Sequence, residues 1–167
     1  MDIRFIADAM LGRLAKWLRI MGYDCEFAPH DKRDIQLMLL EARTPGTVLL
    51  TRDTRLLAHE REVRIIMFRE QHWRDQLKRL LKVLELTPDE RTFFTRCTVC
   101  NEPLKEIPRE EALKSVPART AGHPYKFYRC PSCSKLYWPG THLDGVKREL
   151  LNTLRTGNSR DPYEPLS

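Results

Sequence analysis

The stretch Ile3-Arg4-Phe5-Ile6-Ala7-Asp8 decides the fold, because it predicts a short buried strand that ends in a carboxylate. Helical spacing follows directly, in the apolar residues Met10, Leu11, Leu14, Ala15, Leu18 and Met21. A strand that runs straight into a helix is the first half of a βαβ unit, and ligands bind beyond the carboxyl ends of the strands in such sheets. Asp8 is therefore expected at the edge of the sheet where ligands bind.

The alternation of strand and helix continues as far as Leu86. The sequence predicts further strands at 23–27, 47–51 and 63–68 and helices at about 9–21, 35–42, 56–58 and 70–86. Such alternation is typical of an α/β domain with a mostly parallel sheet and helices on its faces. There is no G-x-G-x-x-G motif and no Walker loop, so neither nucleotide-binding fingerprint is present.

Length and composition fit one domain, or one domain with a small appendage. The chain has 167 residues, of which 41% are hydrophobic and 31% charged, and no apolar run approaches the ~20 residues of a membrane span. Its beginning lacks a charged region followed by an apolar one, so we expect a cytoplasmic protein without a membrane partner. The net charge of +6 suits a polyanionic partner such as nucleic acid, and equally a merely basic protein.

Three aspartates are expected at one edge of the sheet. Asp8 ends the first strand, Asp34 begins the helix after the second, and Asp53 follows the strand at 47–51. At ~5 Å and an effective dielectric near 20, each pair of carboxylates would repel by about 3 kcal/mol, so a cation must offset the repulsion. Oxygen ligands suit Mg²⁺ or Mn²⁺, which can orient and activate water for attack on a phosphodiester.

Each aspartate also has a purely structural interpretation. Asp34 can be a first-turn acid favoured by the helix dipole, with Asp31 as the N-cap. Asp8 and Asp53 can cap the helices that follow them. Phosphatases and response-regulator receivers also place aspartates at strand ends.

Basic residues surround the same predicted edge. Arg13 and Lys16 lie on the first helix, away from its apolar stripe, and Arg52 and Arg55 flank Asp53. They can bind phosphates, which supply most of the affinity for nucleic acid without reading its sequence. A solvated helix face is the alternative interpretation, chiefly for Lys16 and Arg55.

Four of the five cysteines form two C-x-x-C pairs. Cys97 and Cys100 make the first pair, and Cys130 and Cys133 make the second. Two such knuckles predict a closed tetrahedral zinc site, and four protein ligands make that site structural. The fifth, Cys25, shares a face with Tyr23 and Phe27, which is typical of a small buried hydrophobic residue.

Aromatic and basic residues interleave around the second knuckle, in Lys126-Phe127-Tyr128-Arg129 and Lys135-Leu136-Tyr137-Trp138. Such segments can stack bases and bind phosphates, or their aromatics can pack a core that is too small to close without metal. His142 can contact substrate or act as an acid, and it can equally be a surface histidine at the start of a helix signal that runs over 143–156.

Several of these segments resemble the Mut-seven C-terminal RNase domain family. The resemblance lies in residues 5–24, which begin Phe-Ile-Ala-Asp, in Leu49-Leu-Thr-Arg-Asp53, in the four cysteines and in Trp138-Pro-Gly-Thr-His142. It implies a PIN-like nuclease domain fused to a zinc ribbon, with metal-dependent cleavage of RNA. Asp8, Asp34 and Asp53 match the acidic positions of the family, and Arg13 and Arg52 match the adjacent basic ones. PIN nucleases often have a fourth carboxylate, for which this chain offers Glu41 and Asp31.

We therefore expect a PIN-like three-layer α/β domain over residues 1–90, a four-cysteine zinc ribbon with a C-terminal helix over 91–157 and a tail over 158–167. The expected function is that of a ribonuclease, with Mg²⁺ or Mn²⁺ at Asp8, Asp34 and Asp53, phosphates at Arg13, Lys16, Arg52 and His142, and a ribbon that helps to bind RNA. The alternative is an RNA-binding or ribosome-associated module with little catalysis. A metal-dependent phosphatase is a third interpretation, but no phosphoacceptor motif supports it.

Overall fold

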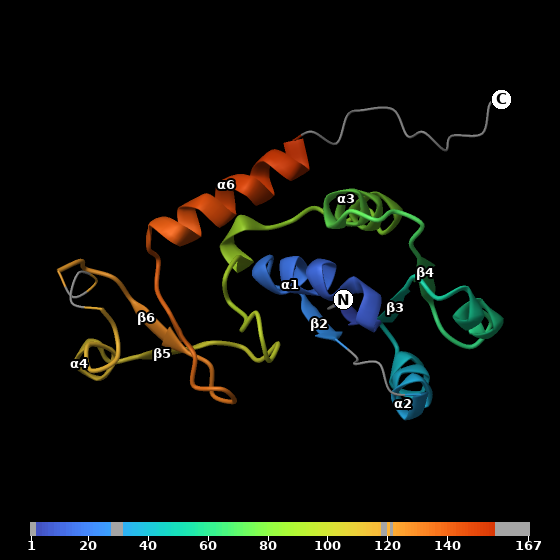
Figure 1. The fold of residues 1–167 in the computed structure, drawn as a ribbon, viewed down its shortest axis with the longest axis horizontal. Helices are drawn as coiled ribbons and strands as arrows, with labels where there is room; N and C mark the ends of the chain where they lie inside the picture. Colours follow the sequence, from blue (N-terminus) through green and yellow to red (C-terminus); the bar gives the residue numbers. More distant parts are fainter. Residues whose placement is uncertain (1–2, 28–31, 118–119, 121, 156–167) are drawn as a thin grey trace.

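The computed structural model describes residues 3–27, 32–117, 120 and 122–155, and for residues 32–34 and 141–142 it describes the backbone alone. A four-stranded sheet lies at the centre of the first part of the chain (Figure 1). The elements of this part, in chain order, are β1 (Arg4–Ala7), η1 (Ala9–Leu11), α1 (Gly12–Ile20), β2 (Asp24–Phe27), α2 (Lys32–Ala42), β3 (Thr47–Thr51), η2 (Thr54–His59), β4 (Ile65–Met67), α3 (Trp73–Val83) and η3 (Glu90–Thr92), where η marks a 3₁₀ turn.

All the pairings in this sheet are parallel, and the strand order is β2-β1-β3-β4. β1 is an inner strand, with Ala7 opposite Phe27 on one side and Leu50 on the other. Parallel strands need crossover connections, and the helices between them supply these. Because all four strands run the same way, their carboxyl ends share one edge, and Asp8 directly follows the last residue of β1.

The sheet is covered on both faces, which gives three layers. Phe5 and Ile6 are neighbours in β1 and point to opposite faces, so each enters a different core cluster. The Phe5 cluster includes α1 and α3, and the Ile6 cluster includes α2 and η2. Burial of side chains of this size stabilises the fold by about 1.5–3 kcal/mol each.

The predicted apolar stripes of the helices form these contacts. Leu14 and Leu18 of α1 and Leu77 and Leu80 of α3 are fully buried in the same cluster. The rings of Trp17 and Trp73 stack at 4.2 Å between α1 and α3. The helix expected at 70–86 is shorter, Trp73–Val83, and the helix expected at 9–21 begins as the 3₁₀ turn η1 because Asp8 caps that turn.

The cysteine-rich part forms a second, antiparallel sheet in the order β5-β6-β7. Its elements are β5 (Lys105–Ile107), α4 (Arg109–Ala112), β6 (Phe127–Arg129) and β7 (Leu136–Tyr137). Together with the clustered cysteines, this arrangement confirms the predicted α/β fold followed by a small ribbon. No helix of the described residues is long and apolar enough to cross a membrane.

The last helix, α6 (Thr141–Arg155), packs back onto the first part of the chain. Leu150 is fully buried in the same cluster as α1 and α3, and Val146 and Leu154 pack against that cluster. Lys147 forms an ion pair with Glu90 at 2.8 Å. The division at residue 90 stays a prediction, and α6, which follows it in the chain, contributes to the core cluster of the first part.

Candidate active site and metal centre

Asp8 is the best-defined acidic side chain at the carboxyl edge of the sheet. Its residue is only 9% exposed, and its amide donates to the carbonyl of Leu50 at 3.0 Å. Its Oδ1 accepts the amide hydrogen of Met10 at 2.9 Å, which makes Asp8 the N-cap of η1. The capping interpretation of Asp8 is therefore confirmed, and it does not by itself exclude a second role.

Thr51 joins Asp8 to the end of β3. Its hydroxyl donates to Oδ2 of Asp8, and the amide of Arg52 donates to the same oxygen at 2.9 Å. The Thr51 hydroxyl oxygen also accepts the amide hydrogen of Asp53 at 2.9 Å. A carboxylate offers about four lone-pair sites, so Oδ2 is fully engaged while Oδ1 keeps one site free of these contacts.

Asp53 lies on the same edge and also caps the turn that follows it, since its Oδ1 accepts from the amide of Arg55 at 2.9 Å. The guanidinium of Arg55 clamps the carboxylate, with Nε 2.9 Å from Oδ1 and a terminal nitrogen 2.6 Å from Oδ2. These hydrogen bonds lower the pKa of Asp53 below its ordinary value. Asp53 is one-fifth exposed and Arg55 about four-fifths exposed, so the clamp can open into solvent.

The predicted basic residues lie beside these aspartates in the chain. Arg13 and Lys16 are exposed on the first turns of α1, which begins four residues after Asp8. Arg52 is partly buried, and its Nε has no hydrogen-bond partner among the described residues. This Nε atom is buried, so a phosphate would reach it only after the Arg52 side chain moves.

Two predicted site residues are described only through their backbone. Asp34 lies in the first turn of α2 and His142 lies in the first turn of α6, and the side chains of both lie outside the described part. Asp31 lies outside it altogether. Their roles stay predictions.

The carboxylate of Glu41 lies at the opposite end of β1 from Asp8. Its carboxylate lies 3.4 Å from Arg4, the first residue of β1, whereas Asp8 follows the other end of that strand. Burial, and then a hydrogen bond with Glu26, raise the pKa of Glu41. Glu41 is therefore not placed to act as the fourth carboxylate of the Asp8 edge.

The four cysteines of the two knuckles converge. The sulfurs of Cys97, Cys100, Cys130 and Cys133 all lie within 4.8 Å of one another, and two of them, on Cys97 and Cys133, are 3.7 Å apart. Zn–S bonds of about 2.3 Å in a tetrahedron place sulfurs about 3.8 Å apart, so the cluster can hold zinc. Among the described residues, this is the one group of three or more cysteine, histidine or acidic side chains close enough to share an ion.

Hydrogen bonds prepare Cys97 for metal. Burial raises its pKa, but the hydroxyl of Tyr137 and the amides of Cys100 and Val99 outweigh this and lower the pKa to about 6. The thiolate is the form that ligates zinc. Phe127 is 1% exposed and packs the ribbon, so it is not a base-stacking platform. Tyr137 is half-buried, and its hydroxyl lies 3.1 Å from the sulfur of Cys97.

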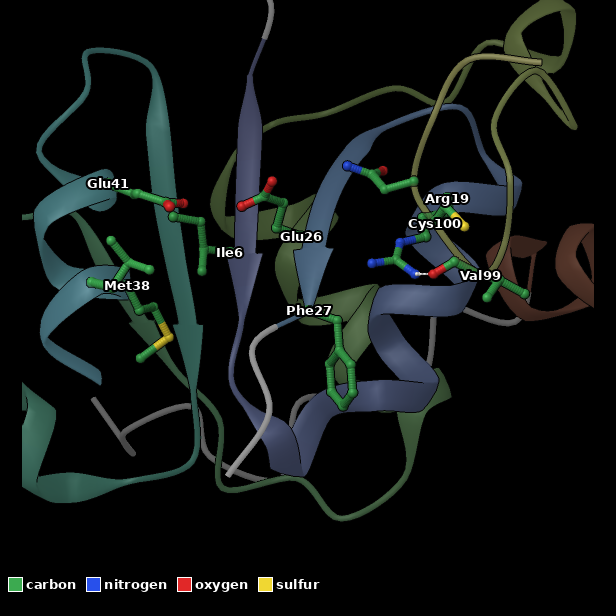
Figure 2. A pocket seen from close by; sticks show the side chains of 10 residues that line it. Ile6, Arg19, Glu26, Phe27, Met38, Glu41, Val99 and Cys100 are labelled. Carbon is green, nitrogen blue, oxygen red and sulfur yellow. Dashed lines mark hydrogen bonds between the residues drawn. The ribbon is translucent and has the colours of Figure 1, made fainter. Parts of the chain in front are cut away.

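The first knuckle docks against β2, the edge strand next to β1. Arg19 of α1 is buried, and its guanidinium donates to the carbonyls of Cys25 at 2.7 Å and Val99 at 2.8 Å (Figure 2). The side chain of Asn101 accepts from the amide of Cys25 at 3.0 Å and donates to Asp24 at 2.7 Å. These contacts satisfy the outer edge of β2, which another chain could otherwise pair with.

Thr51, Arg19 and Asn101 were not singled out by sequence reasoning. Thr51 could have been found from the sequence, because it closes the apolar strand Val48-Leu49-Leu50 and a buried hydroxyl requires a hydrogen-bond partner. Arg19 carries no such signal, since an arginine in a helix is usually solvated.

The chain matches the family model described as Mut7-C RNAse domain over residues 3–150. This range includes the sheet, the two aspartates with described side chains, the four cysteines and most of α6. No curated protein matches the chain.

Proposed function

Since the chain belongs to the Mut7-C RNAse domain family, we propose that it hydrolyses RNA phosphodiesters with a divalent ion held by Asp8, Asp34 and Asp53. The observation that carries the proposal is the buried carboxylate of Asp8 at the carboxyl end of an inner parallel strand, with one Oδ1 lone pair unused by its contacts. Parallel sheets of this kind bind ligands at that edge.

The described donor atoms fit a hard cation. Oδ1 of Asp8 can ligate without giving up any of its hydrogen bonds, and Asp53 can ligate once the exposed Arg55 swings away. Oxygen ligands favour Mg²⁺ or Mn²⁺ over softer metals. When bound, such an ion supplies Lewis-acid assistance to the attack of water on phosphorus.

The chain's own residues would orient the substrate. Arg13, Lys16 and Arg52 would bind phosphates on either side of the cleaved bond. Thr51 and the amide of Arg52 would hold the Asp8 carboxylate in a fixed direction. His142 stays a candidate for contact with the substrate. Such positioning supplies a large part of catalysis in phosphoryl transfer.

The ribbon would lengthen the RNA-binding surface. His123 and Tyr125 stack at 5.0 Å on its surface, and Lys126 is exposed beside them. Exposed aromatic rings stack on unpaired bases, and nearby cations bind the backbone. These three residues replace Phe127 and Tyr137 as the proposed contacts, because Phe127 is buried and the hydroxyl of Tyr137 is engaged with Cys97.

One observation favours the alternative, a module that binds RNA without cleaving it. Asp8 and Asp53 both act as N-caps, which alone is a sufficient structural reason for a short acidic side chain at each position. A binding module would retain its affinity for RNA in EDTA and would leave the RNA intact.

The test compares labelled single-stranded and hairpin RNA with Mn²⁺ or with EDTA, using wild type, Asp8→Asn and Asp53→Asn. Metal-dependent fragments that both variants fail to produce are expected. Asp53→Asn is the more informative variant, because Asp53 is the more exposed of the two and its loss should leave the fold intact, which thermal unfolding would check. Intact RNA with unchanged binding in EDTA would favour the binding module.

A further inference from the structure

Phe27 lies beside the candidate active site with its ring exposed. It is the last residue of β2 and lies opposite Ala7, the residue before Asp8. It is 40% exposed, although it belongs to a strand of the central sheet. A large aromatic side chain left open at the ligand-binding edge of a parallel sheet suggests contact with a ligand.

The ring rests on the backbone of Gly12, at the start of α1. A Cβ added to Gly12 would lie 3.1 Å from Cζ of Phe27 and 3.2 Å from Cε2, so a side chain at this position would push the ring away by a few tenths of an ångström. In Figure 2 the ring projects from the end of β2 beside this helix. One side of the ring is thus supported, and the exposed side can take a flat partner.

A groove of about 330 Å³ is lined by Phe27 and by residues of β1, β2, α2 and the first knuckle. Ile6, Met38 and Val99 form apolar parts of its wall, and Glu26 and Glu41 supply carboxylates (Figure 2). This volume lies in the range of small-molecule sites and exceeds what one nucleobase needs.

The charges of the groove favour a base over a phosphate. Arg4 lies 2.8 Å from Glu26 and 3.4 Å from Glu41, so one cation forms ion pairs with two carboxylates. Arg19, which lines the groove itself, already donates to backbone carbonyls of Cys25, Thr98 and Val99. Both cations are thus already engaged with acceptors and offer little to a phosphate, whereas a base carries no charge and its N–H groups can donate to the carboxylates.

We propose that Phe27 stacks on a base of the RNA next to the phosphate at Asp8, and that the groove lined by Phe27 receives this base. This inference rests on the proposed function for its substrate class. Stacking of this kind tolerates different bases, because every base has a π-face. The ribose-phosphate chain would then pass from the groove towards Arg13 and Arg52 at the carboxyl edge.

The test measures binding of a short fluorescent single-stranded RNA in EDTA, so that no cleavage is needed. Phe27→Ala is expected to weaken binding at least fivefold, Phe27→Leu nearly as much, and Phe27→Trp little. Val83→Ala is the matched control, because Val83 is an exposed apolar residue outside the groove and its loss should leave binding unchanged. Phe27→Leu keeps an apolar side chain of similar size, so it answers the question if Phe27→Ala unfolds.

Abasic RNAs identify stacking as the cause. In a series with one abasic nucleotide at each position, one position should bind wild type weakly and should abolish the difference between wild type and Phe27→Leu. Equal binding by wild type and all Phe27 variants would overturn the inference while cleavage by wild type kept the nuclease proposal. Stacking without metal-dependent cleavage would overturn the nuclease proposal and keep the binding site.

Discussion

The Thr51 hydroxyl donates a hydrogen bond to the carboxylate of Asp8, and Thr51 is fully buried. The same hydroxyl oxygen accepts the amide hydrogen of Asp53, so one uncharged side chain connects two acidic residues that follow different strands. Because Oδ2 of Asp8 is saturated by Thr51 and the amide of Arg52, only Oδ1 is left to meet a ligand. Thr51 thus determines which oxygen of Asp8 is available for chemistry.

Thr51→Val removes this hydroxyl and keeps the shape of the side chain. A buried hydrogen bond to a charged group contributes about 1.5–3 kcal/mol, so the free energy of unfolding should fall by about 2 kcal/mol in a urea titration. Thr51→Ser keeps the hydroxyl and should lose about 1 kcal/mol or less, for one methyl group. A valine variant as stable as wild type would show that the bond contributes nothing to folding.

Arg55→Ala should raise the pKa of Asp53, because the hydrogen bonds of Arg55 are what lower it. Carbon-detected NMR of the carboxyl group would measure this. The chain offers a matched twin, since Arg91 clamps Asp89 through the same contacts and lowers its pKa too. Arg91→Ala should raise the pKa of Asp89 and leave the pKa of Asp53 unchanged. If either variant shifted the pKa values of both carboxyls, the neighbouring arginine would not be the cause.

The same clamp has a pH dependence with a definite sign. The folded-state pKa of Asp53 is lowered, so the contribution of the clamp to stability is present above the unfolded-state pKa of about 3.9 and is lost as the pH falls through the folded-state value. The difference in melting temperature between wild type and Arg55→Ala should therefore be largest near neutral pH and shrink in acid. It should also shrink in high salt, because Arg55 is exposed.

The parallel sheet and the cysteine centre could be predicted because both depend on local patterns. The strand Thr47–Thr51 has the predicted bounds, and Gly22 ends α1 as expected, with a φ of +88°. Two C-x-x-C pairs need no tertiary information to indicate zinc. The clustering of Asp8 and Asp53 at one edge followed from the parallel topology alone.

The remaining features depend on contacts between distant residues. Arg19 is buried because its partners, the carbonyls of Thr98 and Val99, lie about eighty positions further along the chain. The return of α6 onto the first core cluster through Leu150 is equally nonlocal. β5 is only three residues long, which is too short to show the alternating pattern that predicts a strand.

Gly22→Ala should be strongly destabilising. Its φ of +88° is unfavourable for any side chain, and an added Cβ would collide with the carbonyl oxygen of Thr92 and lie 2.8 Å from its Cβ. The combined strain and overpacking should cost on the order of 3 kcal/mol. Gly145→Ala is the control, because its Cβ meets nothing within 4 Å in the middle of α6.

Gly145→Ala should instead raise the free energy of unfolding by about 0.5–1 kcal/mol, the helix propensity difference. In urea titrations, the free energy of unfolding should fall for Gly22→Ala and rise for Gly145→Ala if Thr92 packs against Gly22 as described. Similar losses in both would point to a general intolerance of alanine, unrelated to φ or space.

Arg19→Met should uncouple the zinc centre from the sheet. Arg19 is buried and donates to three carbonyls, of Cys25, Thr98 and Val99, so methionine leaves these acceptors without a donor and should cost about 3 kcal/mol. Arg43→Ala is the matched control, because the ion pair of Arg43 with Glu62 is exposed and contributes less than about 1 kcal/mol.

Hydrogen exchange at the amide of Cys25 measures the coupling between the zinc centre and β2 directly, since that amide donates to Asn101 of the knuckle. In zinc-loaded wild type, a chelator should speed exchange at Cys25, because loss of the metal frees the knuckle from β2. In Arg19→Met exchange should already be faster, and the chelator should add less, as expected for two changes that break one shared contact. If the chelator accelerates exchange equally in both proteins, the zinc centre acts on β2 by a route that does not include Arg19.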